Sequence, residues 1–338
     1  MILAGDIGGT KTLLGLYEGG NPRDQRNSRP LRVLEKSYPS RRYPTFDLVL
    51  EEFLAEAKST LSDSLTITFA SFGVAGPVVH GRCETTNLPW VLDTDSLSTL
   101  LSIDSSRVFL INDLAAIAWG TMFSSEKNLI VLNEGVPDKQ GNQVIVAPGT
   151  GLGESIIAYP TSGPIVISTE GGHSDWAPGN PDDFPLFSYL WARYGHVSIE
   201  RLVSGQGLAN LYKFYTRNLE QSNHPLDPLL SDEMIPAALT HAAMTLKNPL
   251  CTRILDHFCS LLGQEAGNMV LKSLATGGVF LAGGIPEKIL PFLLNSSFME
   301  HFTNKGRYTK LLENIPVRIV NDPEIGILGA WAYATSHQ

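Results

Sequence analysis

The chain has 338 residues, 43% of them hydrophobic, and a formal net charge of −9 at pH 7. This length and composition predict a folded protein of about two domains with apolar cores, and they exclude a disordered chain. The negative charge argues against a nucleic-acid-binding surface, and no apolar run has the length that a membrane-spanning helix needs.

The start of the sequence and the cysteines indicate a reducing compartment. Residues 1–6 contain no basic segment and reach an acidic residue too early for a signal peptide. Cys83, Cys251 and Cys259 fit neither a disulfide framework nor a paired metal site. We therefore expect a cytoplasmic protein without a resident metal.

The first motif is a glycine-containing turn at 5–12, between two apolar strands. Gly8 and Gly9 can adopt positive φ and let backbone N–H groups converge on an anion, and Thr10 adds a hydroxyl donor. Asp6 could hold Mg²⁺ through water, because hard cations prefer oxygen ligands. The turn predicts a phosphate loop, with an ordinary hairpin turn as the alternative.

A polar, arginine-rich stretch at 19–42 follows, and it is more typical of a solvated loop around a strand than of a polyanion-binding face. A helix is expected from Pro44, and a strand at 65–74 runs into a glycine–proline loop. After it, Asn87 offers the donor and the acceptor that a sugar hydroxyl needs. Trp90 is more typical of a core anchor than of a sugar-stacking platform.

A buried strand is expected at 108–111, because this run is apolar and rich in β-branched and aromatic residues. It stops at Asn112 and Asp113, and an alanine-rich helix follows. Ligands of open α/β sheets bind just beyond the carboxyl ends of the strands. A carboxylate held there can accept a proton from a substrate hydroxyl, which makes Asp113 the candidate catalytic base of a sugar kinase. The alternative is that Asn112 or Asp113 only caps the helix.

A second glycine–threonine turn, at 148–153, also lies between apolar β-segments. Its candidate phosphate-binding residues are Thr150 and Gly151. We interpret the two turns as an internal pseudo-repeat, in which each half of the chain offers one phosphate loop to a common cleft. The recurrence strengthens the phosphate interpretation, although the halves are too diverged for a sequence repeat.

Glu170 and His173 flank two glycines, so the backbone must bend tightly and present both side chains together. A Glu-x-x-His metal pair would need a helix here, and the two glycines argue against one. Sugar-hydroxyl binding by a carboxylate and an imidazole fits better, and a structural turn is the alternative. Further on, Ser198 is expected to cap a helix with Glu200 in its first turn, where the sequence alone favours a helix-dipole role for Glu200.

The second half continues with helices expected at 207–217, 234–246 and 251–274. A buried strand then ends at Gly283 and Gly284, a turn that permits close approach of a flat ligand such as adenine, and Pro286 can start the next helix. A last strand at 317–320 leads into an apolar helix at 325–335.

Together these motifs resemble the actin-like sugar kinases (the hexokinase, actin and Hsp70 superfamily), and most closely the bacterial glucokinases that lack zinc. The resemblance covers nearly the whole chain in the family's order of motifs, at 5–12, 110–116, 148–153, 170–178, 195–207 and 281–286. It implies an α/β chain with the two-domain actin-like ATPase (ribonuclease H-like) fold and a ligand cleft between the domains. A small domain would comprise 1–111 plus 322–338, and a large domain would comprise 112–321.

The resemblance also implies ATP-dependent phosphorylation of D-glucose to D-glucose 6-phosphate, the first step of glycolysis, with Asp113 as the general base. Asn112, Glu170, His173 and Glu200 would bind the glucose hydroxyls, and for Glu200 the resemblance overrides the dipole interpretation. ATP would arrive with Mg²⁺ and meet the two phosphate loops and the glycine turn near 283. Homodimers are common in the family.

One departure from the related repressor-and-kinase branch matters. That branch has a cysteine-rich zinc cluster after its sugar-binding histidine, and its repressors carry an N-terminal helix-turn-helix. This chain has no cysteine between Cys83 and Cys251, and its phosphate hairpin starts at the first residues, so we expect neither feature. Two alternatives stay open: an actin-like kinase for another sugar or using polyphosphate, which the arginines support, and a non-catalytic sugar sensor, which would need no phosphate loop.

Overall fold

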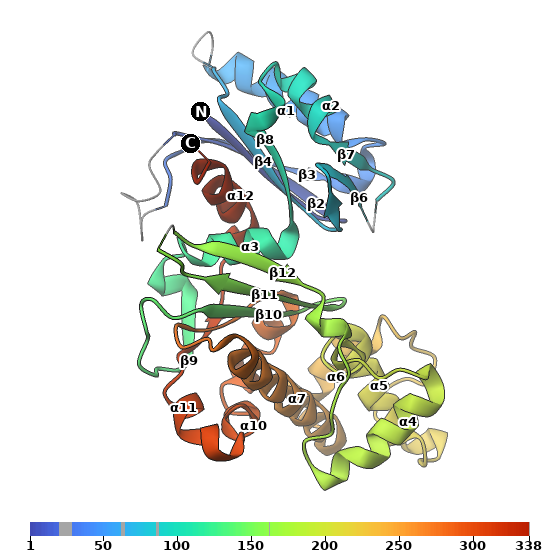
Figure 1. Ribbon diagram of the computed structural model, residues 1–338. Coiled ribbons are helices and arrows are strands. Elements are labelled where there is room, and N and C mark those ends of the chain that lie inside the picture. Colours follow the sequence, from blue (N-terminus) through green and yellow to red (C-terminus); the bar gives the residue numbers. More distant parts are fainter. Residues whose placement is uncertain (20–28, 62–64, 86–87, 162, 338) are drawn as a thin grey trace. The chain divides into compact units, whose positions relative to one another are not determined.

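The computed structural model describes the chain except residues 20–28, 62–64, 86–87, 162 and 338. The chain forms two compact units. Unit 1 comprises Met1–Leu129 and Asp322–Gln338, and unit 2 comprises Ile130–Asn321. Each unit is built on a mixed β-sheet with helices packed against it (Figure 1).

The sheet of unit 1 has the order β3-β2-β1-β4-β8. Its strands are β1 (Ile2–Ile7), β2 (Lys11–Tyr17), β3 (Arg32–Pro39), β4 (Phe69–Val74) and β8 (Val108–Asn112). The three strands β1, β4 and β8 are parallel, with Ile7 opposite Val74 and Val74 opposite Asn112. Their carboxyl ends therefore meet at one edge of the sheet, and Asp6 and Asp113 lie at this edge.

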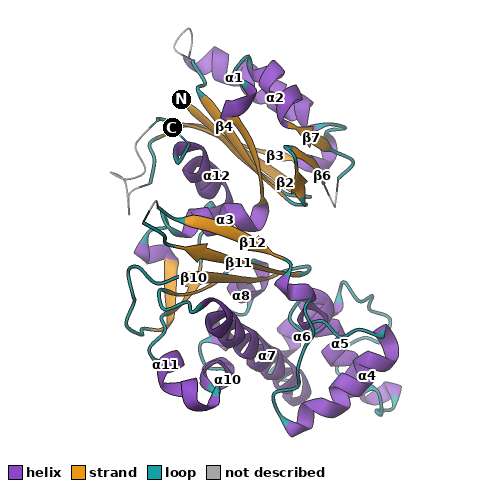
Figure 2. Cartoon of the chain, viewed as in Figure 1, coloured by secondary structure: helices purple, strands orange, loops and turns teal. Residues whose placement is uncertain are grey.

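Helices cover both faces of this sheet (Figure 2). α1 (Phe46–Leu61) and α2 (Thr94–Leu101) bury apolar side chains in one cluster with β1, β2 and β4. Trp90 belongs to this cluster, and its indole N–H donates to the Tyr43 carbonyl at 3.0 Å, so Trp90 is the predicted core anchor. Against the other face, α12 (Ile325–Thr335) packs on β1, β4 and α3 (Asp113–Thr121). A small sheet of β5 (Val78–Val79), β6 (Arg82–Glu84) and β7 (Val91–Asp93) completes the unit.

The sheet of unit 2 has the order β12-β11-β10-β13-β14-β9. Its strands are β9 (Leu129–Asn133), β10 (Gln143–Pro148), β11 (Leu152–Ala158), β12 (Ile165–Thr169), β13 (Gly278–Leu281) and β14 (Val317–Val320). The strand pairing repeats that of unit 1. In both sheets an antiparallel hairpin lies beside parallel strands, and a third strand extends the hairpin outward. The two glycine turns thus occupy equivalent places, as the predicted pseudo-repeat requires.

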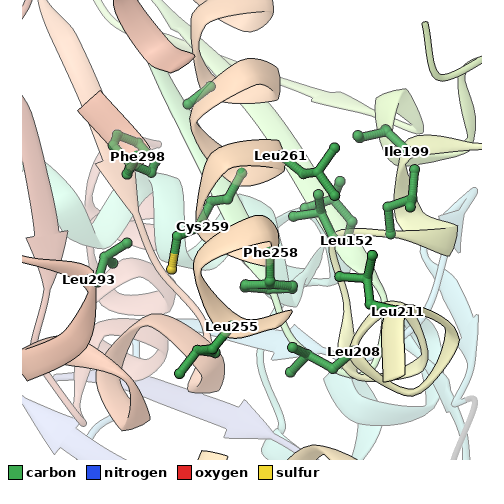
Figure 3. Packing of buried hydrophobic residues seen from close by; sticks show 14 of the residues in the cluster. Leu152, Ile199, Leu208, Leu211, Leu255, Phe258, Cys259, Leu261, Leu293 and Phe298 are labelled. Atoms are coloured by element: carbon green, nitrogen blue, oxygen red, sulfur yellow. The ribbon is translucent and has the colours of Figure 1, made fainter. Parts of the chain in front are cut away.

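The core of unit 2 is organised around α7 (Pro249–Ser273), whose two sides both bury apolar residues. Figure 3 shows Phe258 facing Leu208 and Leu211 of α5 (Gly205–Thr216) and Leu261 on the same side of α7 near Leu152. Cys259 faces the opposite side, where Leu293 and Phe298 lie. On that opposite side α10 (Phe298–Thr303) approaches closely, since an ideal Cβ at position 263 of α7 would lie 2.2 Å from the Phe298 carbonyl oxygen. The remaining helices are α4 (Phe184–Tyr194), α6 (Ile235–Met244), α8 (Gly284–Lys288), α9 (Leu290–Leu293) and α11 (Thr309–Glu313).

The sequence pattern misses some features of this fold. It predicts neither β12 nor α4, a short helix that begins next to Pro185. β4 begins at Phe69 rather than at 65. Unit 1 extends to Leu129, beyond the expected domain boundary at 111, because α3 packs on α12 of the same unit. In the described part of the chain, no helix combines the length and apolar character needed to cross a bilayer.

Candidate active site

The first glycine turn closes the β1–β2 hairpin of unit 1. The Gly8 N–H donates to the Lys11 carbonyl at 3.0 Å, and the Ser40 hydroxyl donates to the Gly8 carbonyl at 2.8 Å. Neither Gly8 nor Gly9 has positive φ, so that part of the expectation is wrong. A side chain at position 8 would be crowded, because an ideal Cβ there would lie 3.1 Å from the Lys11 carbonyl oxygen. Thr10 is exposed at the tip of the turn.

Asp113, the residue after β8, is not the N-cap of α3. Asn112 caps α3, accepting a hydrogen bond from the Leu114 N–H at 2.9 Å, and its amide donates to the Gly76 carbonyl at 3.2 Å. Asp113 also accepts from the Leu114 N–H, at 2.9 Å. Burial raises the pKa of Asp113 above its ordinary value, although hydrogen bonds to its carboxylate lower it again. The N-cap of α3 is therefore Asn112, and capping does not account for the aspartate at position 113.

Asp6 and Asp113 form an acidic pair at the carboxyl ends of the parallel strands. Burial raises the pKa of Asp6 to about 6, and the charge of the Asp113 carboxylate adds to this shift against the opposite effect of Lys11. No described residue is recorded as donating a hydrogen bond to the Asp6 carboxylate, and an ideal Cβ at Gly326 of α12 would lie 2.7 Å from its Oδ2. A half-buried carboxylate without a donor, beside a second carboxylate, suits a hydrated divalent cation.

The second glycine turn lies between β10 and β11 of unit 2. The Gly149 N–H donates to the Gly151 carbonyl at 2.8 Å, and the Gly205 N–H at the start of α5 donates to the Gly149 carbonyl at the same distance. The turn is also fixed by Glu200, whose Oε2 accepts from the Leu152 N–H at 2.9 Å. The exposed Thr150 is left at the tip of the turn.

Three of the predicted sugar ligands gather in unit 2. His173 Nδ1 lies 3.8 Å from Glu200 Oε1, and His173 Nε2 lies 3.9 Å from Glu170 Oε2. Their short helical turns, Gly171–His173 and Ile199–Arg201, are joined by the hydrogen bond from the Ile199 N–H to the Ser174 carbonyl at 3.1 Å. The side chains of Glu170 and His173 are 87% and 63% exposed, so both can reach a ligand.

Two expectations near Glu170, His173 and Glu200 differ from the structure or lie outside it. Ser198 precedes the turn that carries Glu200, but within the described residues its side chain makes no capping hydrogen bond. Ser204 instead caps α5, accepting from the Gly207 N–H at 3.0 Å. Asn87 lies outside the described residues.

A pocket of about 1020 Å³ opens beside the second turn, entirely within unit 2. Gly149, Thr150, Gly205 and Gly284 are among the residues that line it. Gly283 has φ +83°, and an ideal Cβ there would lie 2.8 Å from the Pro148 carbonyl, so glycine is required where β13 passes the turn. The volume is at the upper end of small-molecule sites.

The sequence pattern does not predict the helical part of the pocket lining. α6 and α8 contribute Pro236, Thr240, His241, Met244 and Lys288. In the sequence, α6 has the pattern of an ordinary apolar helix, and only the folded structure shows that it lines the same pocket as Gly149 and Gly284. No signal in the local pattern distinguishes these residues from a core-facing stripe.

Comparison with known proteins assigns this arrangement to a family. The sequence model of the family described as glucokinase matches residues 3–337 of the chain. The chain belongs to the glucokinase family. The glucokinase of Synechocystis sp. is 36% identical over an alignment of 343 positions that covers 97% of this chain and 96% of that protein.

Solved structures agree with the family assignment. The crystal structure of a glucokinase from an Antarctic psychrotroph has a TM-score of 0.85 and 28% identity, and covers 99% of this chain and 98% of that one. A glucokinase from Balamuthia mandrillaris in complex with glucose shares the fold, with a TM-score of 0.73 at 21% identity over 99% and 93% of the two chains. The solved structures confirm the expected sugar-kinase fold, and the family match and the curated relative confirm the expected family and an enzyme of the kinase class.

Proposed function

We propose that this member of the glucokinase family transfers the γ-phosphoryl group of ATP to the 6-hydroxyl of D-glucose, with Asp113 as the general base. The observation that carries the proposal is the state of Asp113, a half-buried carboxylate with a raised pKa at the end of a parallel strand. The capping role that would otherwise explain this residue belongs to Asn112. Asp113 is thus available to accept the hydroxyl proton as the oxygen attacks phosphorus.

The sugar is proposed to be held by Glu170, His173 and Glu200 in unit 2, and by Asn112 and Asn87 in unit 1. Carboxylates accept hydrogen bonds from sugar hydroxyls, and the imidazole of His173 between two carboxylates offers a donor or an acceptor. A wrong epimer would leave one of these polar groups unpaired, which is the strongest available source of sugar discrimination.

The nucleotide is proposed to lie in the pocket of unit 2, with its base against α6 and α8 and its phosphates at Thr150 and Gly151. Gly8, Gly9 and Thr10 would supply the corresponding phosphate contacts from unit 1, and Gly283 and Gly284 would allow the nucleotide to approach the backbone. Mg²⁺ would be held by Asp6 through water, and when bound it offsets charge on the phosphates. A positioned base typically contributes about 10²- to 10⁴-fold to the rate.

We also propose a cytoplasmic homodimer. All three cysteines are free and buried, which suits a reducing compartment. On α4 the side chains of Phe184 and Trp191 are 60% and 54% exposed, and Trp191 stacks on Phe187 at 5.7 Å between ring centroids. Exposed aromatic residues are enriched at interfaces. If α4 forms the interface, Trp191→Glu should halve the mass measured by light scattering, whereas an unchanged mass would place the interface elsewhere.

A coupled assay for glucose 6-phosphate tests the reaction directly. The purified protein should form it from glucose with MgATP and not with polyphosphate. The arginine stretch gives polyphosphate little support in the described residues, since Arg29 pairs with Asp322 and Glu324, and Arg32 pairs with Glu35 and Glu324. Turnover with polyphosphate, or with another hexose in preference to glucose, would contradict the proposal and indicate a different kinase. Binding of glucose without turnover would identify a sugar sensor.

A further inference from the structure

Glu154 is a buried acid that the proposed mechanism does not use. It lies in the middle of β11, opposite Val146 of β10 and Thr169 of β12. Its side chain is fully buried, and neither carboxyl oxygen has a hydrogen-bond partner among the described residues. A charged carboxylate in such a place would be strongly destabilising.

The charged groups that act on Glu154 lie on α7, and Lys305, after α10, contacts the same helix. Glu265 of α7 raises the pKa of Glu154, and Lys272 of the same helix lowers it. Both carboxyl oxygens of Glu265 are already engaged, by Asn268 at 3.0 Å and Lys272 at 3.2 Å. Lys305 is also committed, donating to Asn268 at 2.7 Å and to the Gln264 carbonyl at 3.0 Å. With burial as the main cause, the pKa of Glu154 reaches about 8, so the neutral acid predominates at pH 7.

The carboxyl group of Glu154 occupies the space beneath the turn that carries Glu170 and His173. An ideal Cβ at Gly171, between these two residues, would lie only 2.1 Å from Glu154 Oε2. The Thr169 hydroxyl, at the start of the turn, donates to the Glu154 carbonyl at 3.0 Å and accepts from the Gly171 N–H at 3.2 Å. Glu154 therefore supports the turn through its backbone and through its side chain.

We propose that Glu154 is a positioning residue for sugar binding, and that its uncharged carboxylic acid holds the Glu170–His173 turn in the shape that binds glucose. The inference rests on the proposed function, since the turn is taken to be a sugar site. Ionisation of Glu154 would place an unpaired charge under the turn and displace it. Sugar affinity then depends on the protonation of a residue that never touches the sugar.

The first test is the pH dependence of the glucose KM between pH 6.5 and 9.5, with saturating MgATP. If only the protonated form binds glucose, KM rises about tenfold by pH 9, while kcat changes far less. Glu154→Gln, which keeps the shape and cannot ionise, should have a glucose KM near the neutral wild-type value across the range. Ser155→Ala, a buried neighbour whose side chain alternates to the other face of the strand, is the matched control and should retain the wild-type profile.

The second test asks whether Glu154 acts through Gly171. Gly171→Ala has no positive φ to oppose it, so its effect should come from the close approach to Glu154. We expect it to raise the glucose KM strongly in the wild-type background and much less in Glu154→Ala, where the space is empty. Glu154→Ala alone should raise KM by about tenfold, with rescue by Glu154→Gln.

The outcomes separate this inference from the proposed function. A wild-type KM that stays flat above pH 8, or an equal alkaline rise in Glu154→Gln, would overturn the role of Glu154 while glucose phosphorylation stands. Additive effects of Gly171→Ala and Glu154→Ala would also overturn it. Absence of glucose phosphorylation at every pH would reject the proposed function and this inference with it.

Discussion

Glu200 Oε2 accepts a hydrogen bond from the Leu152 N–H at 2.9 Å, so a candidate sugar ligand holds the first residue after the second phosphate turn. An ideal Cβ at Gly151 would lie 2.5 Å from the same oxygen, which shows how tightly the carboxylate fits against the turn. Loss of sugar contacts at Glu200 should therefore disturb the nucleotide as well.

Glu170→Gln and Glu200→Gln are expected to differ in this respect. In the proposed sugar site each substitution removes a charge-assisted hydrogen bond to a sugar hydroxyl, worth about 1.5–3 kcal/mol, and should weaken glucose use by roughly tenfold or more. Only Glu200→Gln should also raise the KM for ATP, because only Glu200 contacts the phosphate turn. Steady-state kinetics with each substrate varied in turn measures both effects. Unchanged glucose kinetics in either variant would remove that residue from the site.

Asp113→Asn should separate binding from chemistry. Asparagine keeps the size and the hydrogen bond from the Leu114 N–H but cannot take up a proton. Glucose affinity, measured by titration calorimetry, should change little, while kcat falls by about 10²-fold or more. Since Asn112 already caps α3, the fold should tolerate the change. Normal turnover in this variant would show that Asp113 is not the base.

Asp6 should make the enzyme less stable at neutral pH than at acidic pH when no nucleotide is bound. Its pKa is raised from 3.8 to about 6, so its stabilising effect is complete below pH 3.8 and is lost as the pH rises through 6. Asp6→Asn should match the wild type near pH 4 and gain up to about 3 kcal/mol in unfolding free energy at pH 7. Urea unfolding at both pH values measures the gain. The exposed Asp47→Asn is the control, and an equal gain there would contradict the assignment.

Gly329→Ala should loosen the contact between α12 and α3. An ideal Cβ at Gly329 would lie 1.6 Å from the Ala116 carbonyl oxygen, so the helices must separate. Overpacking of this kind costs about 1–3 kcal/mol, and because α3 begins at Asp113 the displacement should also lower kcat. Ser336→Ala, at the exposed end of the same helix, should stay within about 0.5 kcal/mol of the wild type. Thermal unfolding and the coupled assay together check the prediction, and a wild-type Tm for Gly329→Ala would refute it.

The predictable parts of the fold are those with a strong local pattern. The last strand and helix, at 317–320 and 325–335, begin and end where the sequence predicts. The helix is almost uniformly apolar, the strand is apolar apart from Arg318, and polar residues follow both. α4 is missed because Pro185 and the exposed aromatic residues hide the helical period. The extent of unit 1 depends on the α3–α12 contact between segments far apart in the chain, which no local pattern encodes.

The candidate site also contains residues that the sequence predicts and residues that it does not. Turns rich in glycine and polar residues predict Gly8, Thr150 and Glu170 as site residues, since such composition is unusual between buried strands. His241 and Glu154 carry no comparable signal, because one lies on an apolar helix and the other in a strand. Only the tertiary fold shows that His241 lines the pocket and that Glu154 lies against Gly171.

The position of α12 has a consequence for synthesis on the ribosome. Residues 1–129 emerge first, but the helix that covers β1 and β4 is made only after the whole of unit 2. Until then Asp322, which holds Arg29, Ser124 and Asn128 by hydrogen bonds, is also missing. The nascent unit 1 therefore waits with an uncovered apolar sheet face while unit 2 folds, and this face is where a chaperone would bind the growing chain.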